Sequence, residues 1–302
     1  MSDLNVYTTS QINALTPITG DMVVDSDLNA VKLYDGAAWR TWNSDSTVVP
    51  FNNEWGATFS SDYLETGSDP GLTGIKTVSM WFNTSATSRG WVVSGLGGSA
   101  YTTYGGLGVD NNQKIYWNDG YSGGVGSTAY TPGTWVHFCA VHVASGYSDT
   151  AGTATPNGGG GWYMYQNGTR VDVSVGHIAG NTYGQTPIST TNKFKIGREG
   201  ERSGQYYFDG KIDEVALFTS SLSASDVSDI YNSGTPVDLG ADGLNLSPDI
   251  YYRMGDDSND SPSAGGNISS ISDSSGNGHH LTQSTASNQP TFSDLTGETI
   301  YV

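Results

Sequence analysis

Carboxylate pairs are the first candidates for chemistry in this chain. Glycoside hydrolases use two Glu or Asp carboxyl groups, about 5 Å apart in retaining enzymes and about 6.5–9.5 Å apart in inverting ones. The chain has six glutamates, of which only Glu199 and Glu201 alternate on one face of a segment. Arg198 and Arg202 flank this pair in a glycine-containing loop, which indicates a solvated charge cluster. We therefore predict a protein without enzymatic activity.

Histidine and cysteine offer no stronger site. His137 and His142 fall on opposite faces of one predicted strand, so structural or hydrogen-bonding roles are favoured over metal ligation. The sequence has no H-x-x-x-H or C-x-x-C spacing of the kind that holds a transition metal. The one cysteine, Cys139, lies in an apolar run, which predicts a buried, unreactive thiol and excludes an internal disulfide.

Charge and hydropathy limit the partners. The 302 residues include 30 Asp and Glu but 12 Lys and Arg, giving a formal net charge of −18. Phosphate binding depends on Lys and Arg, so we expect no nucleic acid partner. An acidic chain instead favours cations such as Ca²⁺, which take oxygen ligands. No apolar run approaches the ~20 residues of a membrane span, and the start, MSDLNVYTTS, has no signal-peptide character. We expect neither membrane insertion nor Sec export.

Composition and alternation predict an all-β fold. The chain has 41 Gly, 18 Tyr and 8 Trp but few charged residues, which suits short strands joined by tight turns. About a dozen strands at this spacing indicate an antiparallel β-sandwich. The main expected strands are Phe59–Leu64, Thr77–Asn83, Trp91–Leu96, Gly106–Asp110, Lys114–Asn118, Thr134–Val143, Trp162–Gln166, Arg170–Val175, Lys193–Ile196 and Phe208–Phe218.

Residues 1–48 form a separate small unit in this interpretation. A short helix is expected over Thr8–Leu15, followed by a β-meander with strands at Asp21–Asp25, Val31–Tyr34 and Ala38–Trp42. These strands carry too few apolar side chains for a core that is stable alone. The unit must therefore pack on the main domain, on a copy of itself or on a partner.

The stretch 207–234 carries the densest local signals. The alternation of apolar residues is shifted by one position at Asp213 and Glu214. This pattern predicts a strand with one displaced position, where these two residues are exposed or bent outward. Ser223 is expected to cap the following helix, and Asp226 lies three residues later in its acidic first turn. The stretch is thus predicted to fold as turn, buried strand and short capped helix.

This stretch also resembles a known family. IDEVALF followed by LSASDVSDIYNSG is similar to the closing strand and helix of laminin-G-like, concanavalin A-like jelly-roll domains. Earlier segments, including TVSMWFN and GTWVHFCAV, resemble family motifs in the same order from residue 49 onward. The resemblance implies a concanavalin A-like jelly roll over residues 49–236.

A calcium site is implied by the same resemblance. Many laminin-G-like domains hold Ca²⁺ with the aspartate of the IDEV strand, which is Asp213 here, and Asp62 is a second implied ligand. The alternative is that Asp213 only accepts hydrogen bonds from backbone amides in a turn.

Tyrosines near predicted turns form a candidate sugar-contacting rim. As a set they suit recognition, because loops carry function on a rigid scaffold. The alternatives for each are ordinary packing or contact with another subunit. The residues are Tyr101, Tyr104, Tyr121, Tyr130 and Tyr183.

Both ends of the chain carry further resemblances. GDMVVDSDLNAVKLYDGAAWRTW is similar to modules of bacteriophage tail and head fibres, which implies that residues 1–48 attach the protein to a particle.

Within residues 237–302, SPDIYYRMGDD and ISDSSGNGHHLTQ resemble the first strands of the jelly roll. We favour an extension that completes its own sandwich, because unpaired strand edges are costly. The alternative is an extension that completes a neighbouring subunit.

These patterns favour one function over two others. We expect a non-enzymatic bacteriophage protein on the virion surface, of the tail-fibre, head-fibre or capsid-decoration type. It would be a homo-oligomer that binds other virion proteins and adheres weakly to a host glycan. The alternative is a secreted carbohydrate-binding module or a glycoside hydrolase of the same fold. A third possibility is a coat protein that binds only other coat subunits.

Overall fold

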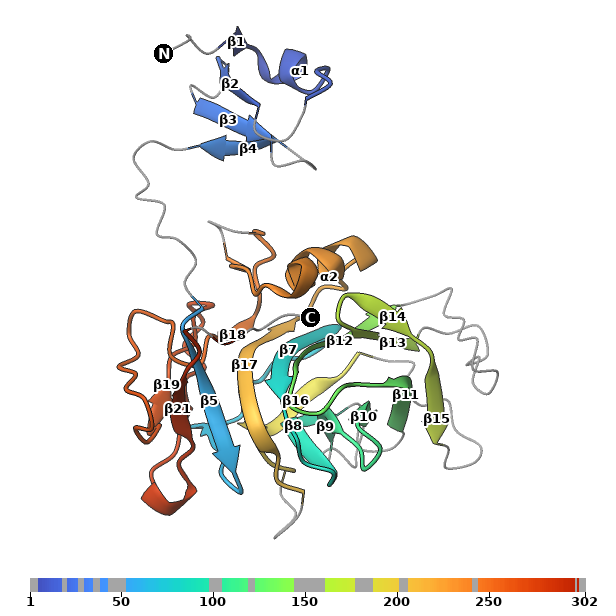
Figure 1. The fold of residues 1–302 in the computed structure, drawn as a ribbon, viewed down its shortest axis with the longest axis vertical. Coiled ribbons are helices and arrows are strands. Elements are labelled where there is room, and N and C mark those ends of the chain that lie inside the picture. Colours follow the sequence, from blue (N-terminus) through green and yellow to red (C-terminus); the bar gives the residue numbers. More distant parts are fainter. Residues whose placement is uncertain are drawn as a thin grey trace. The chain divides into compact units, whose positions relative to one another are not determined.

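The computed structural model describes residues 5–17, 21–26, 30–34, 39–42, 53–97, 105–118, 123–143, 161–176, 187–200, 206–240, 244–296 and 298. The chain divides into two compact units, Met1–Asn52 and Asn53–Val302, and Figure 1 labels many of the elements in each. No helix among the described residues is long and apolar enough to cross a membrane.

The N-terminal unit is a four-stranded sheet with one short helix. The sheet has the order β1-β2-β3-β4, and its strands are β1 Val6–Tyr7, β2 Met22–Asp25, β3 Ala30–Tyr34 and β4 Trp39–Trp42. The last three strands lie where the meander is predicted, whereas β1, which runs parallel to β2, has no predicted counterpart. The helix α1 (Thr9–Ile12) is one turn long, and Thr8 and Gln11 form a capping box at its start.

The second unit is a sandwich of two antiparallel sheets, which confirms the predicted fold class. The nine-stranded sheet has the order β15-β11-β10-β9-β8-β16-β6-β20-β19. Its strands are β6 Leu64–Thr66, β8 Gly90–Gly97, β9 Gly105–Val109, β10 Lys114–Asn118, β11 Gly123–Ala129, β15 Val173–Gly176, β16 Ser189–Ile196, β19 Ser270–Ile271 and β20 Leu281–Thr282.

The facing sheet has eight strands in the order β14-β13-β12-β7-β17-β5-β21, with β18 also paired to β17. Its strands are β5 Trp55–Ser60, β7 Thr77–Asn83, β12 Trp135–Val143, β13 Gly161–Gln166, β14 Thr169–Val171, β17 Asp209–Phe218, β18 Ile250–Tyr252 and β21 Thr291–Asp294. From the C-terminal segment, β18 pairs with β17, β20 with β6 and β21 with β5. This segment therefore forms part of both sheets of its own sandwich.

Two predicted strands are wrong in the same way. Phe59–Leu64 is not one strand, because the chain turns at Ser61, whose φ of 65° is left-handed, and continues in the other sheet as β6. Arg170–Val175 divides at Asp172 into β14 and β15, which also belong to different sheets. The strand β11 has no predicted counterpart, because its sequence GGVGSTA is poor in strand-forming side chains.

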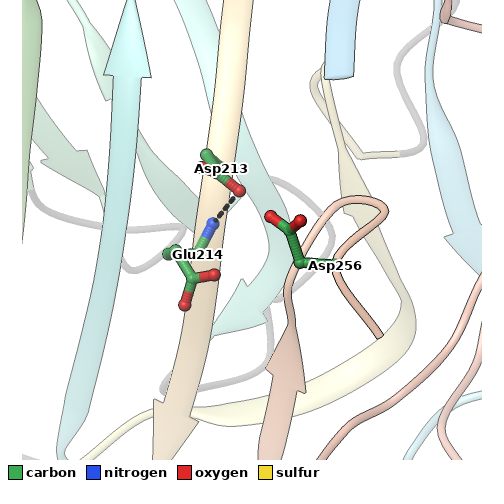
Figure 2. A group of neighbouring side chains, drawn as sticks. All are labelled: Asp213, Glu214 and Asp256. Atoms are coloured by element: carbon green, nitrogen blue, oxygen red, sulfur yellow. Dashed lines mark hydrogen bonds between the residues drawn. The ribbon is translucent and has the colours of Figure 1, made fainter. Parts of the chain in front are cut away.

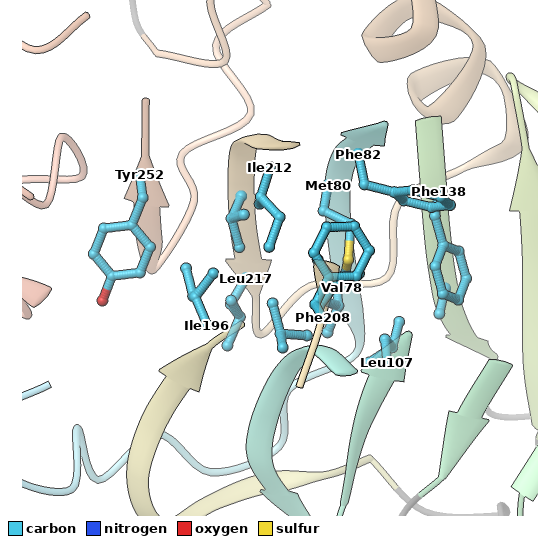
Figure 3. Packing of buried hydrophobic residues seen from close by; sticks show 14 of the residues in the cluster. Val78, Met80, Phe82, Leu107, Phe138, Ile196, Phe208, Ile212, Leu217 and Tyr252 are labelled. Atoms are coloured by element: carbon cyan, nitrogen blue, oxygen red, sulfur yellow. The ribbon is translucent and has the colours of Figure 1, made fainter. Parts of the chain in front are cut away.

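The main core lies between the two sheets, as Figure 3 shows. Val78, Met80 and Phe82 of β7 point into it and are fully buried, because side chains alternate between the faces of a strand. Ile212 and Leu217 of β17 meet them there. Burying this many large side chains is the main driving force for folding of the sandwich.

A helical layer covers the outer face of the eight-stranded sheet. The helix α2 (Ala224–Tyr231) begins at the predicted cap Ser223, which forms a capping box with Asp226, and it ends at Asn232 in the left-handed conformation. A second apolar cluster fills the space beneath it, which explains why the run in β12 is apolar on both faces. Its buried members are Cys139, Val141, Tyr165, Ala216, Phe218, Leu222, Val227, Ile230, Leu239 and Tyr251.

Candidate metal centre

A β-bulge in β17 creates the candidate site. Between Asp213 and Ala216, β17 has two residues where the facing part of β7 has one. Glu214 has a left-handed φ of 47°, which a glutamate adopts only where its surroundings enforce it. Ile212 and Val215 both enter the main core, so the two acidic residues between them are left outside it. Bulges of this kind commonly re-aim side chains beside functional sites.

Two further chain segments meet at the bulge. On one edge of β17, β5 pairs with Asp209–Ile212 and β18 pairs with Val215–Leu217. The start of β5 and the end of β18 therefore lie next to each other. Asn53 precedes β5, whereas Arg253 and Asp256 follow β18. Side chains from three distant parts of the sequence converge on one point.

Figure 2 shows the three carboxylates of this cluster. One oxygen from each of Asp213, Glu214 and Asp256 lies within 4.8 Å of the others. Asp213 Oδ1 accepts a hydrogen bond from the backbone N–H of Glu214 at 2.8 Å, and its Oδ2 accepts one from Asn53 Nδ2 at 2.8 Å. The hydroxyl of Tyr251 donates to Glu214 Oε2. The arrangement is thus held by its own hydrogen bonds and is not a chance grouping of mobile side chains.

Asp256 fastens the cluster to the first strand of the sandwich. Its two carboxylate oxygens accept hydrogen bonds from the backbone N–H groups of Glu54 and Trp55, at 3.1 and 3.2 Å. These bonds connect the loop after β18 directly to the beginning of β5. The cluster therefore joins the C-terminal segment to the rest of the fold.

The cluster carries excess negative charge away from water. Asp213 and Glu214 are only 1% and 4% exposed. Among the described residues, Arg253 is the cation paired with the cluster, with its Nε 3.5 Å from Glu214 Oε1, so one guanidinium there opposes three carboxylates. Burial raises the pKa of Glu214 to about 7, although Arg253 and Tyr251 act in the opposite direction. Burial also raises the pKa of Asp256 to about 6.

The pKa of Asp213 is also raised. Burial, followed by the charge of Glu214, holds the pKa of Asp213 well above its usual range. Like charges so close together disfavour joint ionisation. A bound cation would reverse this effect, because it stabilises the ionised form of every carboxylate that it touches.

The donor atoms fit a hard divalent cation. Three carboxylates and one guanidinium leave a formal charge of −2. Asn53 Oδ1 is a buried oxygen without a hydrogen-bond donor in the described part of the chain, and Glu214 Oε1 has only the ion pair with Arg253. Buried acceptors left in this state are costly unless an ion or water satisfies them. An all-oxygen donor set suits Ca²⁺ or Mg²⁺ rather than a transition metal, and Ca²⁺ accepts the irregular geometry better.

The structure places the two predicted ligands apart. Asp213 lies in the cluster, whereas Asp62 lies in the turn between β5 and β6 and accepts a hydrogen bond from the backbone N–H of Ser60 at 3.0 Å. Asp62 does not belong to this group of carboxylates. Sequence reasoning missed Glu214 and Asp256 as partners. Glu214 adjoins Asp213 and could have been found from the displaced strand position, but Asp256 is brought near only by the pairing of β18 with β17.

Two other predictions from the sequence need correction. Tyr130 is 5% exposed and packs edge-to-face against Phe82 in the core, so it does not offer a ring face to a sugar. Glu199 is 4% exposed, which contradicts a solvated charge cluster. The remaining predicted residues lie outside the described part of the chain; they are Tyr101, Tyr104, Tyr121, Tyr183 and Glu201.

Comparison with known families agrees with this fold. Residues 58–228 match a laminin-G family model described as the concanavalin A-like lectin/glucanases superfamily. The chain belongs to this superfamily. The matched residues include Asp213 and Glu214, whereas Asp256 lies beyond them. This superfamily member thus completes its carboxylate cluster from outside the matched region. A comparison with curated proteins finds no match.

Comparison with solved structures finds similarities at low sequence identity. A putative carbohydrate binding protein from Bacteroides ovatus is 15% identical with a TM-score of 0.54, and the match covers 93% of this chain and 70% of that one. A heptameric SAP-like pentraxin from Limulus polyphemus is 13% identical with a TM-score of 0.42, covering 59% and 82%. The CBM40 of a Ruminococcus gnavus IT-sialidase, bound to α2,3 sialyllactose, is 14% identical with a TM-score of 0.36, covering 58% and 96%.

Proposed function

We propose that this superfamily member is a non-catalytic carbohydrate-binding protein whose carboxylate cluster holds Ca²⁺. The observation that carries the proposal is the burial of Asp213 and Glu214. A glycoside hydrolase needs both of its carboxyl groups against the scissile bond, and a sugar ring has no access to carboxylates enclosed in this way. A single ion can be enclosed there. The arrangement therefore favours a lectin-like binding function over glucanase activity.

Ca²⁺ has a structural role in this proposal. Asp213, Glu214 and Asp256 would ligate the ion, and Asn53 would offer its free amide oxygen. The ion would supply positive charge and would fix the C-terminal segment to β5 and β17. Water or backbone oxygens would complete the six to eight ligands that Ca²⁺ usually takes.

The sugar-binding part is supported by family membership and by the likeness to the putative carbohydrate binding protein from Bacteroides ovatus. A glycan array with the full chain in Ca²⁺ buffer tests it. We expect retention of at least one saccharide class, with every bound oligosaccharide recovered at its original length. Release of new reducing ends that is lost in Glu214→Gln or Glu199→Gln would overturn the non-catalytic assignment. Absence of any retained glycan would overturn the carbohydrate-binding assignment.

We also propose that the protein lies on the surface of a bacteriophage virion, joined to other virion proteins through its N-terminal unit. The resemblance of residues 20–42 to fibre modules supports this location, as does the separate compactness of Met1–Asn52. Immunogold electron microscopy of purified particles tests it, and we expect label at the head surface or along the tail. Label found only in the particle-free fraction would favour a secreted carbohydrate-binding module instead.

A further inference from the structure

An arginine on the outer face of the nine-stranded sheet is surrounded by aromatic rings. Arg89 precedes β8, and its Cζ lies 4.1 Å from the ring centre of Tyr116, 5.2 Å from that of Tyr206 and 5.3 Å from that of Trp91. Tyr116 alternates with core residues along β10, so it faces away from the core. Three rings thus hold one guanidinium in place by cation–π attraction.

In the described part of the chain, the protein leaves a hydrogen-bond donor of this guanidinium without an acceptor. Its Nε is buried without an acceptor, and among the described residues no carboxylate forms an ion pair with Arg89. By contrast, Arg198 donates to the carbonyl oxygens of Glu199 and Gly200, both at 3.1 Å. Arg253 faces the carboxylate of Glu214. A buried Nε–H without an acceptor is unusual for an arginine in a chain with so many acids.

Tyr206 adds an exposed ring beside this cation. It is 43% exposed, the most of any large apolar side chain in the described part of the sandwich. Its φ of 48° is left-handed, a strained conformation for a bulky residue that is often found at functional sites. Tyr116 is also fixed, because Asn118 Nδ2 donates to its hydroxyl at 2.9 Å. The ring of Tyr116 is therefore positioned before any ligand arrives.

We propose that Arg89, Tyr116 and Tyr206 bind a saccharide that carries a carboxylate group. This inference rests on the proposed carbohydrate-binding function and assigns it a site and a ligand class. A guanidinium can donate two parallel hydrogen bonds to one carboxylate, while the C–H face of the sugar ring packs against the exposed tyrosine. The net charge of −18 opposes an anion at long range, but it is screened beyond about 8 Å at physiological ionic strength.

Binding of purified acidic oligosaccharides to the full chain tests the site. One set of ligands carries uronic acids and another carries sialic acid, and each is compared with its carboxyl-reduced form. We expect Arg89→Gln to weaken binding of an acidic ligand about ten- to a hundredfold, and carboxyl reduction to do the same for the unmodified protein. Arg89→Lys keeps the charge but not the planar guanidinium. Its affinity for an acidic ligand should therefore fall between that of the unmodified protein and that of Arg89→Gln.

Arg170→Gln provides the matched control. Arg170 also stacks on a tyrosine, Tyr163, at 3.7 Å, but on β13 and β14 of the other sheet. We expect this variant to bind as the unmodified protein does. If Arg89→Gln and Arg170→Gln lost the same affinity for acidic ligands, the proposed site would be wrong. It would also be wrong if Arg89→Gln bound acidic ligands as the unmodified protein does. Retention of neutral glycans alone, unaffected by Arg89→Gln, would overturn the site while leaving the carbohydrate-binding function intact.

Discussion

Removing Ca²⁺ with EDTA is expected to lower the melting temperature of the sandwich by roughly 5–10 °C at pH 8 and by little at pH 5. An ion present at a hundred times its Kd contributes about 2.7 kcal/mol, and each kcal/mol corresponds to about 2–4 °C in a domain of this size. The measurement is a pair of thermal unfolding scans, with Ca²⁺ and with EDTA, repeated across this pH range.

The pH dependence follows from the raised pKa values in the metal-free cluster. Glu214 and Asp256 have folded pKa values of about 7 and about 6, above the ordinary values of about 4 in an unfolded chain. Their contribution to stability is therefore fully present below about pH 4 and is lost as the pH rises through about 6 to 7. Ca²⁺ prevents this loss above pH 7, because it binds the ionised carboxylates, and protons displace it below about pH 6.

The contribution of His137 to stability changes over a pH range that overlaps that of the cluster, so the two effects must be separated. Burial lowers the pKa of His137 to about 3, so its contribution to stability is present above about pH 6.5 and is lost as the pH falls toward 3. This loss affects the Ca²⁺ and EDTA samples alike. The difference between the two melting curves therefore isolates the cluster. Identical curves at pH 8 would contradict a Ca²⁺ site.

Deleting Glu214 is expected to abolish the response to Ca²⁺ while leaving the sandwich folded. Glu214 is the additional residue of the bulge, so its loss makes β17 regular against β7. Side chains along β17 then alternate regularly between the two faces of the sheet, with Ile212 and Val215 directed inward and Asp213 and Ala216 outward. The strain of a left-handed glutamate, about 1–3 kcal/mol, is also relieved. Circular dichroism and melting with and without EDTA provide the readouts.

Glu214→Gln is the matched control for this deletion. It keeps the bulge and the side-chain volume but removes one charge, so Ca²⁺ should still bind, only more weakly. A deletion variant that unfolds would show that the bulge is needed by the sheet itself. A deletion variant that stays folded and still gains stability from Ca²⁺ would place the ion elsewhere.

The local features of the fold could be predicted from the sequence, and the non-local ones could not. The strands Thr77–Asn83 and Lys114–Asn118 have the predicted bounds, because alternation and turns set them within a few residues. The helix cap at Ser223 is equally local. By contrast, the chain crosses between sheets at Ser61 and Asp172, and no change in apolar pattern marks those crossings.

The candidate site shows the same limit. Asp213 stood out through a family motif, and the displaced strand position beside it was visible in the apolar pattern. Asp256 is more than forty residues away in sequence, so only the pairing of β18 with β17 identifies it as a neighbour. Tyr130 precedes a predicted turn, but its ring is directed into the core. Position in the sequence gives nearness to a turn, not the direction of a side chain.

Titration of Ca²⁺ into metal-stripped protein by isothermal calorimetry tests the central claim most directly. We predict one site per chain at pH 7, with proton release that becomes smaller when the titration is repeated at pH 8.5, because Glu214 is then already ionised. The Glu214 deletion should give no heat of binding. Absence of binding in the unmodified protein, or equal binding in the deletion variant, would contradict a Ca²⁺ site formed by Asp213, Glu214 and Asp256.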